Sequence, residues 1–296
     1  MYWYRLERSL GRFSLVATTI KDPSLLPEDI AADEKHSKRL GEKVYAATTV
    51  AKGCVLGAHV CKTAGNDDLK EGYSVFQQEA TDIKEDYSPK TVNTDGWVAT
   101  INAFQALFPM IIMIPCFLHL YIKMRDRAKI KYRDLFRQAA DKLWNCYHAS
   151  SKRSFSQRVR RLHQWANNEE NNLPSVILNP INKLKNKVHS FSASYDHPHA
   201  HRTSNMLDRL MQRMSRHLYD TQYFHGFIDS ATLGIRAWAL IYNFAPSNPY
   251  TVKKHGGKFK SPAERLNNKS YHDDWLHNLL ISGSISGYKP PPLNPL

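Results

Sequence analysis

Three stretches near the start of the chain have the composition and length of β-strands. They cover residues 29–38, 43–50 and 54–61, and few residues separate one from the next. The tripeptide Ala51-Lys52-Gly53 joins the second stretch to the third and has the composition of a hairpin turn. The pattern therefore predicts three consecutive strands.

A helix and a fourth strand follow. Asn66 can cap the helix by accepting a hydrogen bond from a free backbone N–H. The apolar residues of this helix are spaced four, three and four positions apart, as one helix face requires: Leu69, Tyr73, Phe76 and Ala80. Residues 91–94 then form a short predicted strand that ends in Asp95.

The most apolar part of the chain, residues 98–122, resembles a membrane segment on first sight. Polar residues and prolines interrupt it, and its uninterrupted apolar part is shorter than the ~20 residues of a span. A second helix from Trp97 to Pro109, followed by a buried strand at residues 110–114, fits the spacing better. The expected apolar positions of this helix are Val98, Ile101, Phe104, Leu107 and Phe108. We therefore expect no membrane association.

The predicted order is β-β-β-α-β-α-β, which is the order of a ribonuclease H-like mixed sheet. The predicted fold class is therefore α/β. In that arrangement the first strand carries an acid in its middle and the fourth strand ends in an acid beside it. Asp33 and Asp95 occupy these two places. Carboxylate oxygens are the ligands that divalent cations such as Mg²⁺ prefer, so the two aspartates are candidates for a shared metal site.

From about residue 125 the chain changes to charged helices, which predicts an inserted helical subdomain. Two helices are expected, at residues 126–147 and 153–166. In the second, one face is apolar, and Arg158 and Arg161 lie largely on other faces. These arginines either bind DNA phosphates or belong to a solvated helix surface.

A further helix follows the insertion. Thr203 or Ser204 can cap it, and its apolar stripe contains Met206, Leu210 and Met214. Asp208 lies off the centre of this stripe, so it can face the acidic edge of the sheet. Basic residues on the same helix are positioned to meet a DNA backbone: Arg209, Arg213 and Arg216.

The excess of basic residues is consistent with a polyanionic partner, but many proteins with such a charge bind no nucleic acid. Lysine and arginine total 41 residues against 27 acidic ones, which gives a formal charge of +14. The chain has four cysteines and no recognisable signal peptide, so we expect free thiols and an intracellular location.

Four motifs together resemble the core of a DDE-type transposase of bacterial insertion sequences, similar to the Mutator-like group. They are Asp33-Glu34-Lys35-His36, Asn93-Thr94-Asp95-Gly96-Trp97, Cys116-x2-His119 and Arg202-Thr203-Ser204-Asn205-x2-Asp208-Arg209. The resemblance covers roughly residues 28–249. It implies a catalytic triad of Asp33, Asp95 and Asp208 that binds two Mg²⁺ or Mn²⁺ ions, with Cys116 and His119 in a supporting role.

The resemblance also implies how the chain is organised. Residues 28–124 and 190–250 form the two parts of the catalytic core, and residues 125–189 form the helical insertion between them. Residues 1–27 are then an N-terminal remnant, and residues 251–296 a basic, Pro-rich tail. Two features depart from the family: the third acid is usually glutamate, and a module that recognises the element ends usually precedes the core. The chain is therefore expected to be a truncated copy.

The implied activity is metal-dependent cleavage of DNA and strand transfer, without a covalent enzyme intermediate. The implied partners are double-stranded DNA and a second copy of the chain or a larger assembly, and the implied location is the nucleoid. Arg202 joins the arginines that we expect to contact DNA. Two other functions stay open, a DNA-binding remnant without metal chemistry and a ribonuclease H-like nuclease or resolvase.

Several individual residues keep two interpretations. Glu34 beside Asp33 is also consistent with an exposed strand pair, and Glu169 or Glu170 could replace Asp208 as third acid. Cys116 and His119 have zinc spacing, but a structural site needs about four ligands, so we favour a supporting role. His197, His199 and His201 alternate in the loop before the helix that carries Asp208, and they either bind metal or are solvated or phosphate-facing. We expect Trp144, Trp165 and Trp238 to pack in cores, with base stacking as the alternative for an aromatic in the insertion.

Overall fold

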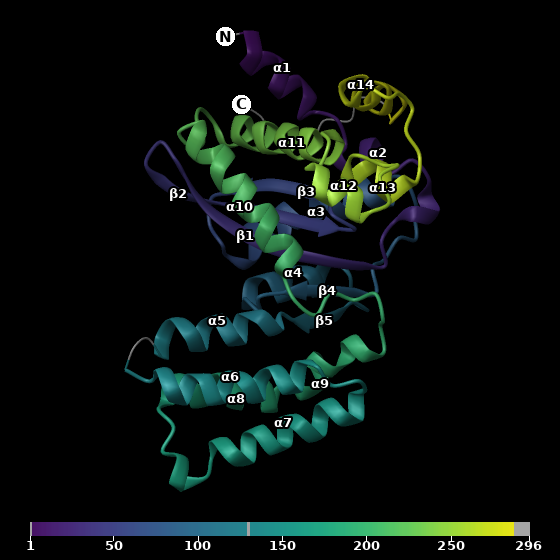
Figure 1. Ribbon diagram of the computed structural model, residues 1–296. Helices are drawn as coiled ribbons and strands as arrows, with labels where there is room; N and C mark the ends of the chain where they lie inside the picture. Colours follow the sequence, from purple (N-terminus) through teal and green to yellow (C-terminus); the bar gives the residue numbers. More distant parts are fainter. Residues whose placement is uncertain (1, 129–130, 287–296) are drawn as a thin grey trace. The chain divides into compact units, whose positions relative to one another are not determined.

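The computed structural model describes residues 2–128 and 131–286 (Figure 1). Helices make up 58% of the protein and strands 14%, and its five strands form a mixed sheet, which confirms the α/β class. The chain divides into two compact units. The first contains residues 1–90, 97–111 and 206–296, and the second contains residues 91–96 and 112–205. We describe each unit by itself.

The first unit contains the three predicted strands, β1 (Asp29–Arg39), β2 (Glu42–Ala51) and β3 (Cys54–Cys61). Each pairs with the next in antiparallel fashion. The turn between β2 and β3 places Lys52 at φ 50° and Gly53 at φ 82°. Two successive residues with positive φ form the hairpin turn whose twist matches the flanking strands, and glycine adopts this conformation without a steric penalty. The predicted hairpin is confirmed.

Helices cover both faces of these three strands. On one face lie α3 (Asn66–Thr81) and α4 (Val98–Leu107), and on the other lie α10 (Asn205–Asp220) and α11 (Ile228–Phe244). The core on the α10–α11 side combines apolar residues of all three strands with apolar residues of both helices. Asn243 of α11 fixes β3 as well, because its amide accepts from Val55 N and donates to Val55 O, both at 2.8 Å.

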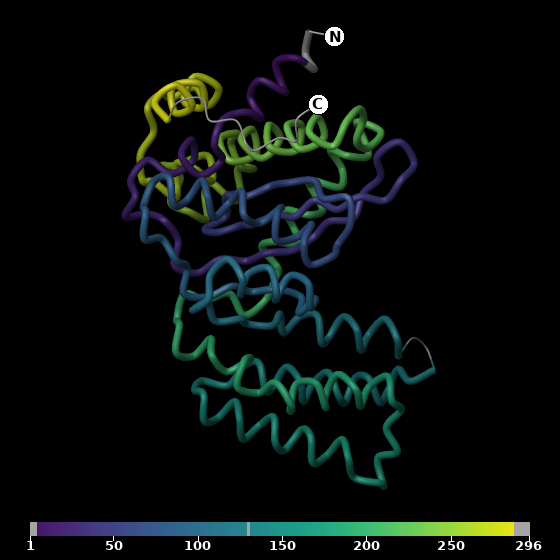
Figure 2. Tube along the Cα trace, turned by 180° about the vertical axis from the view of Figure 1, so that it is seen from behind, coloured from purple at the N-terminus to yellow at the C-terminus, as the bar shows by residue number. Residues whose placement is uncertain are grey.

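Short helices from both ends of the chain belong to this unit (Figure 2). They are α1 (Tyr2–Leu10), α2 (Leu15–Thr19) and the 3₁₀ helix η1 (Pro23–Leu25) at the start, and α12 (Pro249–Lys254), α13 (Pro262–Asn267) and α14 (Trp275–Ser286) at the end. Leu15 and Leu279 are completely buried in the core. Asn267 joins the two ends by donating to Thr19 O at 2.8 Å.

Both terminal segments contribute to the buried interior of this unit. Within residues 15–20 and 262–283, several side chains are buried, among them Leu15, Val16, Leu266 and Leu279. The Pro-rich end from residue 289 to 296 lies outside the described residues.

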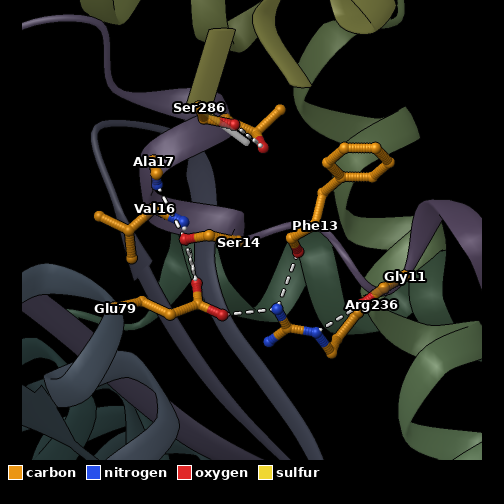
Figure 3. A network of polar contacts seen from close by, with 9 residues as sticks. Gly11, Phe13, Ser14, Val16, Ala17, Glu79, Arg236 and Ser286 are labelled. Carbon is orange, nitrogen blue, oxygen red and sulfur yellow. Dashed lines mark hydrogen bonds and ion pairs between the residues drawn. The ribbon is translucent and has the colours of Figure 1, made fainter. Parts of the chain in front are cut away.

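A buried ion pair connects the N-terminal segment to the rest of the unit (Figure 3). Arg236 of α11 donates from Nη2 to Oε1 of Glu79 in α3 at 2.5 Å, and its side chain is fully buried. The same guanidinium donates from Nε to Gly11 O and from Nη2 to Phe13 O, each at 2.9 Å. The other oxygen of Glu79 accepts from Ser14 Oγ at 2.9 Å. One charge pair thus holds three elements that are distant in sequence.

The second unit contains a pair of parallel strands and a helical subdomain. Strand β4 (Thr91–Thr94) pairs with β5 (Ile112–Pro115). The helices are α5 (Phe117–Ala128), α6 (Arg133–Tyr147), α7 (Lys152–Ala166), α8 (Ser175–Asn186) and α9 (Val188–Ser192), with the 3₁₀ helices η2 (Glu169–Asn171) and η3 (Ala193–Tyr195). Their shared apolar core confirms the predicted buried face of α7.

The element order β-β-β-α-β-α-β is confirmed, but several details differ from expectation. Gly65, and not Asn66, occupies the cap position of α3. The buried face of α4 contains Ala99, Thr100, Ala103 and Phe104, because that side packs on α3, whereas Val98 is exposed. Strand β5 begins at Ile112, and Met110 is 86% exposed, so the predicted buried strand is shorter. The predicted helix at residues 126–147 is divided between α5 and α6.

Two further expectations concern chemistry and environment. The four cysteines, Cys54, Cys61, Cys116 and Cys146, are free and buried, which confirms the expected thiols. Among the helices within residues 2–128 and 131–286, none combines the length and the apolar character needed to cross a membrane.

Candidate metal centre and basic surfaces

Asp33 and Glu34 lie in the middle of β1, both half-buried, and their carboxylates provide oxygen atoms within 4.8 Å of each other. Neighbouring residues of a strand point to opposite faces of the sheet. Asp33 pairs with Thr48 of β2. The neighbouring pairs on the same face are Ala31 with Val50 and Lys35 with Ala46. Since Ala31, Val50 and Ala46 belong to the core under α10 and α11, Asp33 projects toward that face.

Glu34 projects toward the opposite face, where two hydroxyl groups bind it. Tyr73 of α3 donates to Glu34 Oε1 at 2.5 Å, and Thr100 of α4 donates to the same oxygen at 2.6 Å. Burial, together with the charges of Glu34 and Asp33, raises the pKa of Tyr73 well above its usual value, so this hydroxyl keeps its proton and donates. Glu34 is therefore positioned by α3 and α4, and Asp33 is the acid on the face that α10 covers.

Asp208 lies in the first turn of α10 and is half-buried. Leu207 and Leu210 beside it pack into the same core as Ala31, so α10 covers the face of the sheet to which Asp33 points. Among the described residues, however, Asp208 is not part of a group of three or more potential metal ligands within 4.8 Å. Glu169 and Glu170 are exposed in η2 and do not belong to such a group either.

Asp95 follows directly after β4 and is half-buried. The end of β4 is fixed by Cys116 N, which donates to Thr94 O at 2.7 Å, and by Gly96 N, which donates to Thr94 Oγ1 at 3.2 Å. Gly96 has φ +85°, a conformation that residues with a side chain rarely adopt. The Asp-Gly pair after the strand therefore forms a tight turn that holds Asp95 at the strand's carboxyl end.

A lysine from the helical subdomain reaches this turn. A Cβ atom at Gly96 would lie 3.7 Å from Nζ of Lys183, which belongs to α8. Burial lowers the pKa of Lys183, and the charges of Lys123 and Lys187 lower it further, while Asp95 acts in the opposite direction. Lys183 thus places a positive charge beside the Asp95 turn. Lys183 is one of many lysines in the sequence, and no motif distinguishes it.

Cys116 and His119 form a small polar cluster with Ser204. The backbone N of Ser204 donates to Cys116 Sγ, and Cys116 Sγ donates to Ser204 Oγ, each at 3.2 Å. Burial acts to raise the pKa of Cys116, but its hydrogen bonds with His119 and Ser204 and the charge of His119 outweigh this effect, so the pKa lies below its usual value. The cluster connects the end of β5 to the segment before α10, which is consistent with a supporting role.

The arginines predicted to contact DNA have different environments. Arg202 is held internally: its guanidinium lies 4.6 Å and 4.7 Å from the ring centres of Tyr147 and Tyr195, and its Nη2 donates to Tyr147 O at 2.9 Å. With aromatic contacts of this kind, Arg202 has a structural role in the second unit. Arg209, Arg213 and Arg216 are exposed on α10, and Arg213 lies 5.5 Å from the ring centre of Tyr242.

Arg158 and Arg161 line an open basic pocket of about 360 Å³ between α6 and α7. Lys142 and Asn145 of α6 line it as well. Arg158 Nη1 donates to Asn145 O at 2.6 Å and to Asn145 Oδ1 at 2.9 Å, which fixes the guanidinium at the rim. A pocket lined by three cationic side chains is suited to a phosphate group.

The remaining candidates show no metal cluster within the described part of the chain. His197, His199 and His201 do not form a ligand group there. The tryptophans contact aromatic or basic side chains. The ring centres of Trp144 and Phe117 are 6.3 Å apart, and the ring of Trp238 stacks with the rings of His217 and Tyr242. Nζ of Lys142 lies 5.0 Å from the ring centre of Trp165.

Comparison of the chain with profiles of known protein families and with curated proteins finds no match.

Proposed function

We propose that this protein is the catalytic core of a DDE-type DNA transposase, built on a ribonuclease H-like sheet. The observation that carries the proposal is the place of each acid in the order of elements. Asp33 lies in the middle of β1, Asp95 directly follows β4, and Asp208 lies in α10 after the helical subdomain. This is the pattern that the sequence motifs of the family require.

In the proposed site, Asp33, Asp95 and Asp208 would together bind the divalent cations, as the resemblance of the sequence motifs to the family implies. Half-buried carboxylates fit Mg²⁺ or Mn²⁺, which take oxygen ligands and keep several waters. When bound, two such ions would activate water or a DNA 3′-hydroxyl and stabilise the leaving oxygen of the phosphodiester. Asp33 and Asp95 are held by backbone structure on rigid elements, as an in-line phosphoryl transfer requires.

Positive charge near these residues would bind the DNA backbone. Lys183 beside the Asp95 turn is placed to contact a phosphate close to the cleaved bond. The basic pocket lined by Arg158, Arg161 and Lys142 would bind a second phosphate of the DNA. The exposed Arg209 and Arg216 of α10 would contact a third segment of the DNA backbone. Because Arg202 is enclosed by tyrosines, we do not include it among the DNA contacts.

The test is nicking of supercoiled DNA in Mn²⁺, with the reaction in EDTA as reference. Asp33→Asn and Asp95→Asn should each lower the nicking rate by at least about a hundredfold, because each removes a metal ligand. Asp134→Asn, an exposed acid of α6, is the matched control and should nick at the parent rate. Equal rates in all four proteins would show that the nicking is not performed by this site.

A second function is a DNA-binding protein without metal chemistry, which the formal charge of +14 and the exposed arginines of α10 favour. A protein with an incomplete triad would bind DNA through its basic surfaces and would not cut it. Calorimetric titration with Mn²⁺ separates the two. The transposase core requires metal binding that Asp95→Asn and Asp208→Asn both weaken. DNA binding without any metal binding by the parent protein would support the remnant.

A further inference from the structure

A second group of potential metal ligands lies far along the sequence from the proposed catalytic acids. His272, Asp274 and His277 each offer a ligand atom, and these atoms all lie within 4.8 Å of one another. All three side chains are exposed, at the loop that leads into α14. The rings of His272 and His277 are 4.9 Å apart between centres.

The backbone that carries the three residues is well fixed. Tyr271 N donates to Asn278 Oδ1 at 3.0 Å, and Ser270 Oγ donates to His272 O at 2.6 Å. Lys21 Nζ lies 3.9 Å from the ring centre of Tyr271, which holds the loop against the N-terminal segment. A ligand set on such a loop loses little conformational freedom when a metal binds.

Asp274 has one role that needs no metal. Its Oδ1 accepts from the backbone N of Leu276 and of His277, each at 3.0 Å, and so caps the first turn of α14. The cap explains the aspartate and leaves its Oδ2 as a further oxygen ligand. It does not explain the two histidines, one on each side of the cap, which approach the same carboxylate: His277 Nδ1 is 3.1 Å from Asp274 Oδ1.

We propose that His272, Asp274 and His277 form a surface site for a transition-metal ion of the Zn²⁺ class. Two imidazoles and one carboxylate are a ligand set that suits Zn²⁺, Ni²⁺ or Cu²⁺ better than Mg²⁺ or Mn²⁺. Three protein ligands leave the fourth position of a tetrahedral ion to water. The site is separate in sequence and in ligand type from the proposed transposase centre, and the inference does not rest on that function.

Metal binding requires modest rearrangement. Ligand atoms of a tetrahedral zinc site are about 3.3 Å apart, given bonds of about 2.0 Å, so exposed side chains have to close by rotation about their own bonds. His272 Nδ1 now accepts from Asp274 N at 2.9 Å, and this bond is lost when the ring turns toward the metal. Because the amide is exposed, water replaces the lost acceptor. The helix dipole of α14 opposes a cation weakly, and the carboxylate charge compensates for it.

A bound ion would connect the loop to the first turn of α14, and α14 packs against α2 and α11. The expected consequence is a metal-dependent increase in the stability of the first unit, since a ligand that binds the native state stabilises it by mass action. The metal would then hold the start of α14 in place, in addition to the packing of its buried Leu279 in the core.

The experiment is calorimetric titration of the full chain with ZnCl₂ and, separately, MnCl₂. His272→Gln and His277→Gln should each weaken zinc binding by at least about tenfold, because each removes a direct ligand. His255→Gln, an exposed histidine at the end of α12, is the matched control and should bind zinc as the parent does. Zinc should also raise the melting temperature of the parent and of His255→Gln, but not of the double variant His272→Gln/His277→Gln.

Equal zinc affinity in the parent and in the double variant would overturn the inference, and so would the absence of zinc binding by the parent. Asp95→Asn separates this site from the proposed catalytic centre. It should lose Mn²⁺ binding and keep the zinc binding that depends on His277. Zinc binding that is lost in Asp95→Asn and kept in the double histidine variant would place the zinc at the other centre and refute the assignment.

Discussion

The buried pair of Glu79 and Arg236 gives the sharpest test of how the first unit is held together. Glu79→Ala would leave the guanidinium of Arg236, which is 0% exposed, without its counter-charge. It would also leave Ser14 Oγ and Val16 N without the acceptor they now share, at 2.9 Å and 3.1 Å. Removing one partner of a buried ion pair costs about 3–5 kcal/mol, because the other charge stays buried.

This loss of unfolding free energy is large relative to the total stability of a typical domain. Domains are typically stable by about 5–15 kcal/mol, so the variant should lose at least about a fifth of its unfolding free energy. The pair between Lys90 and Glu28, with side chains 56% and 63% exposed, is the matched control. Lys90→Ala should cost at most about 1 kcal/mol, since water and salt screen an exposed pair.

The assay is urea denaturation followed by circular dichroism, with Glu79→Met, Arg236→Met and the double variant in one series. The double variant should be more stable than the sum of the two single losses predicts, because it buries neither charge alone. Nη1 of Arg236 has no hydrogen-bond partner among the described residues. Replacing this side chain therefore costs less unfolding free energy than replacing a guanidinium whose nitrogens are all hydrogen-bonded. Equal midpoints for Glu79→Ala and Lys90→Ala would refute the reasoning.

Two further predictions concern packing and pH. Gly11→Ala should destabilise the protein by about 1–3 kcal/mol, because its Cβ would lie 2.0 Å from the backbone oxygen of Leu233; Gly234→Ala, with nothing within 4 Å, should be neutral or slightly stabilising in the same urea assay. Burial lowers the pKa of His59 from 6.5 to about 4, so the unfolded chain binds a proton first as the pH falls. Stability should therefore decrease by about 2–3 kcal/mol between pH 6.5 and pH 4. Thermal unfolding across this range measures the loss, and an unchanged pH slope in His59→Gln would contradict the assignment.

The sequence predicts the first three strands well because their signals are local. Each strand is bounded by a turn, and Lys52-Gly53 is enough to locate the hairpin between β2 and β3. The face of α3 is equally local, since Leu69 and Tyr73 recur at helical spacing and both are buried. Such patterns need no knowledge of what packs against them.

The burial of the two ends of the chain could not be predicted in this way. Ser14 meets Glu79 across 65 positions, and Glu79 meets Arg236 across 157. A short segment such as residues 15–19 shows too few periodic positions to be recognised as core, and its partners are known from the folded chain alone. The buried face of α4 was predicted only in part for a related reason: Phe104 is buried as expected, but the side that contacts α3 is also lined by small residues such as Ala99 and Ala103.

The candidate site was predictable where a motif carries it and not where packing decides. Asp33 and Asp95 are marked by their positions in and after strands, and the structure places both at half-buried positions on those elements. Arg202 has the same composition signal as Arg209, yet two tyrosines enclose the first while the second is exposed. The contact of Cys116 with Ser204 spans 88 positions and has no signal in the sequence beyond the motifs themselves.

The division of the first unit into three separate stretches of chain has a consequence for synthesis on the ribosome. Strands β1, β2 and β3 are synthesised early. The backbone N atoms of Val55 and Val60 in β3 obtain their hydrogen-bond acceptors, Asn243 and Thr232, only when α11 has been synthesised. Until α11 leaves the exit tunnel, the apolar face of these strands is uncovered while residues 112–205 of the second unit are made and can begin to fold. A ribosome that stalls or terminates within that interval would release a chain with a bare sheet, which is a substrate for chaperones and proteases. Slow translation between β3 and α11 should therefore lower the yield of this protein more than slow translation after α14.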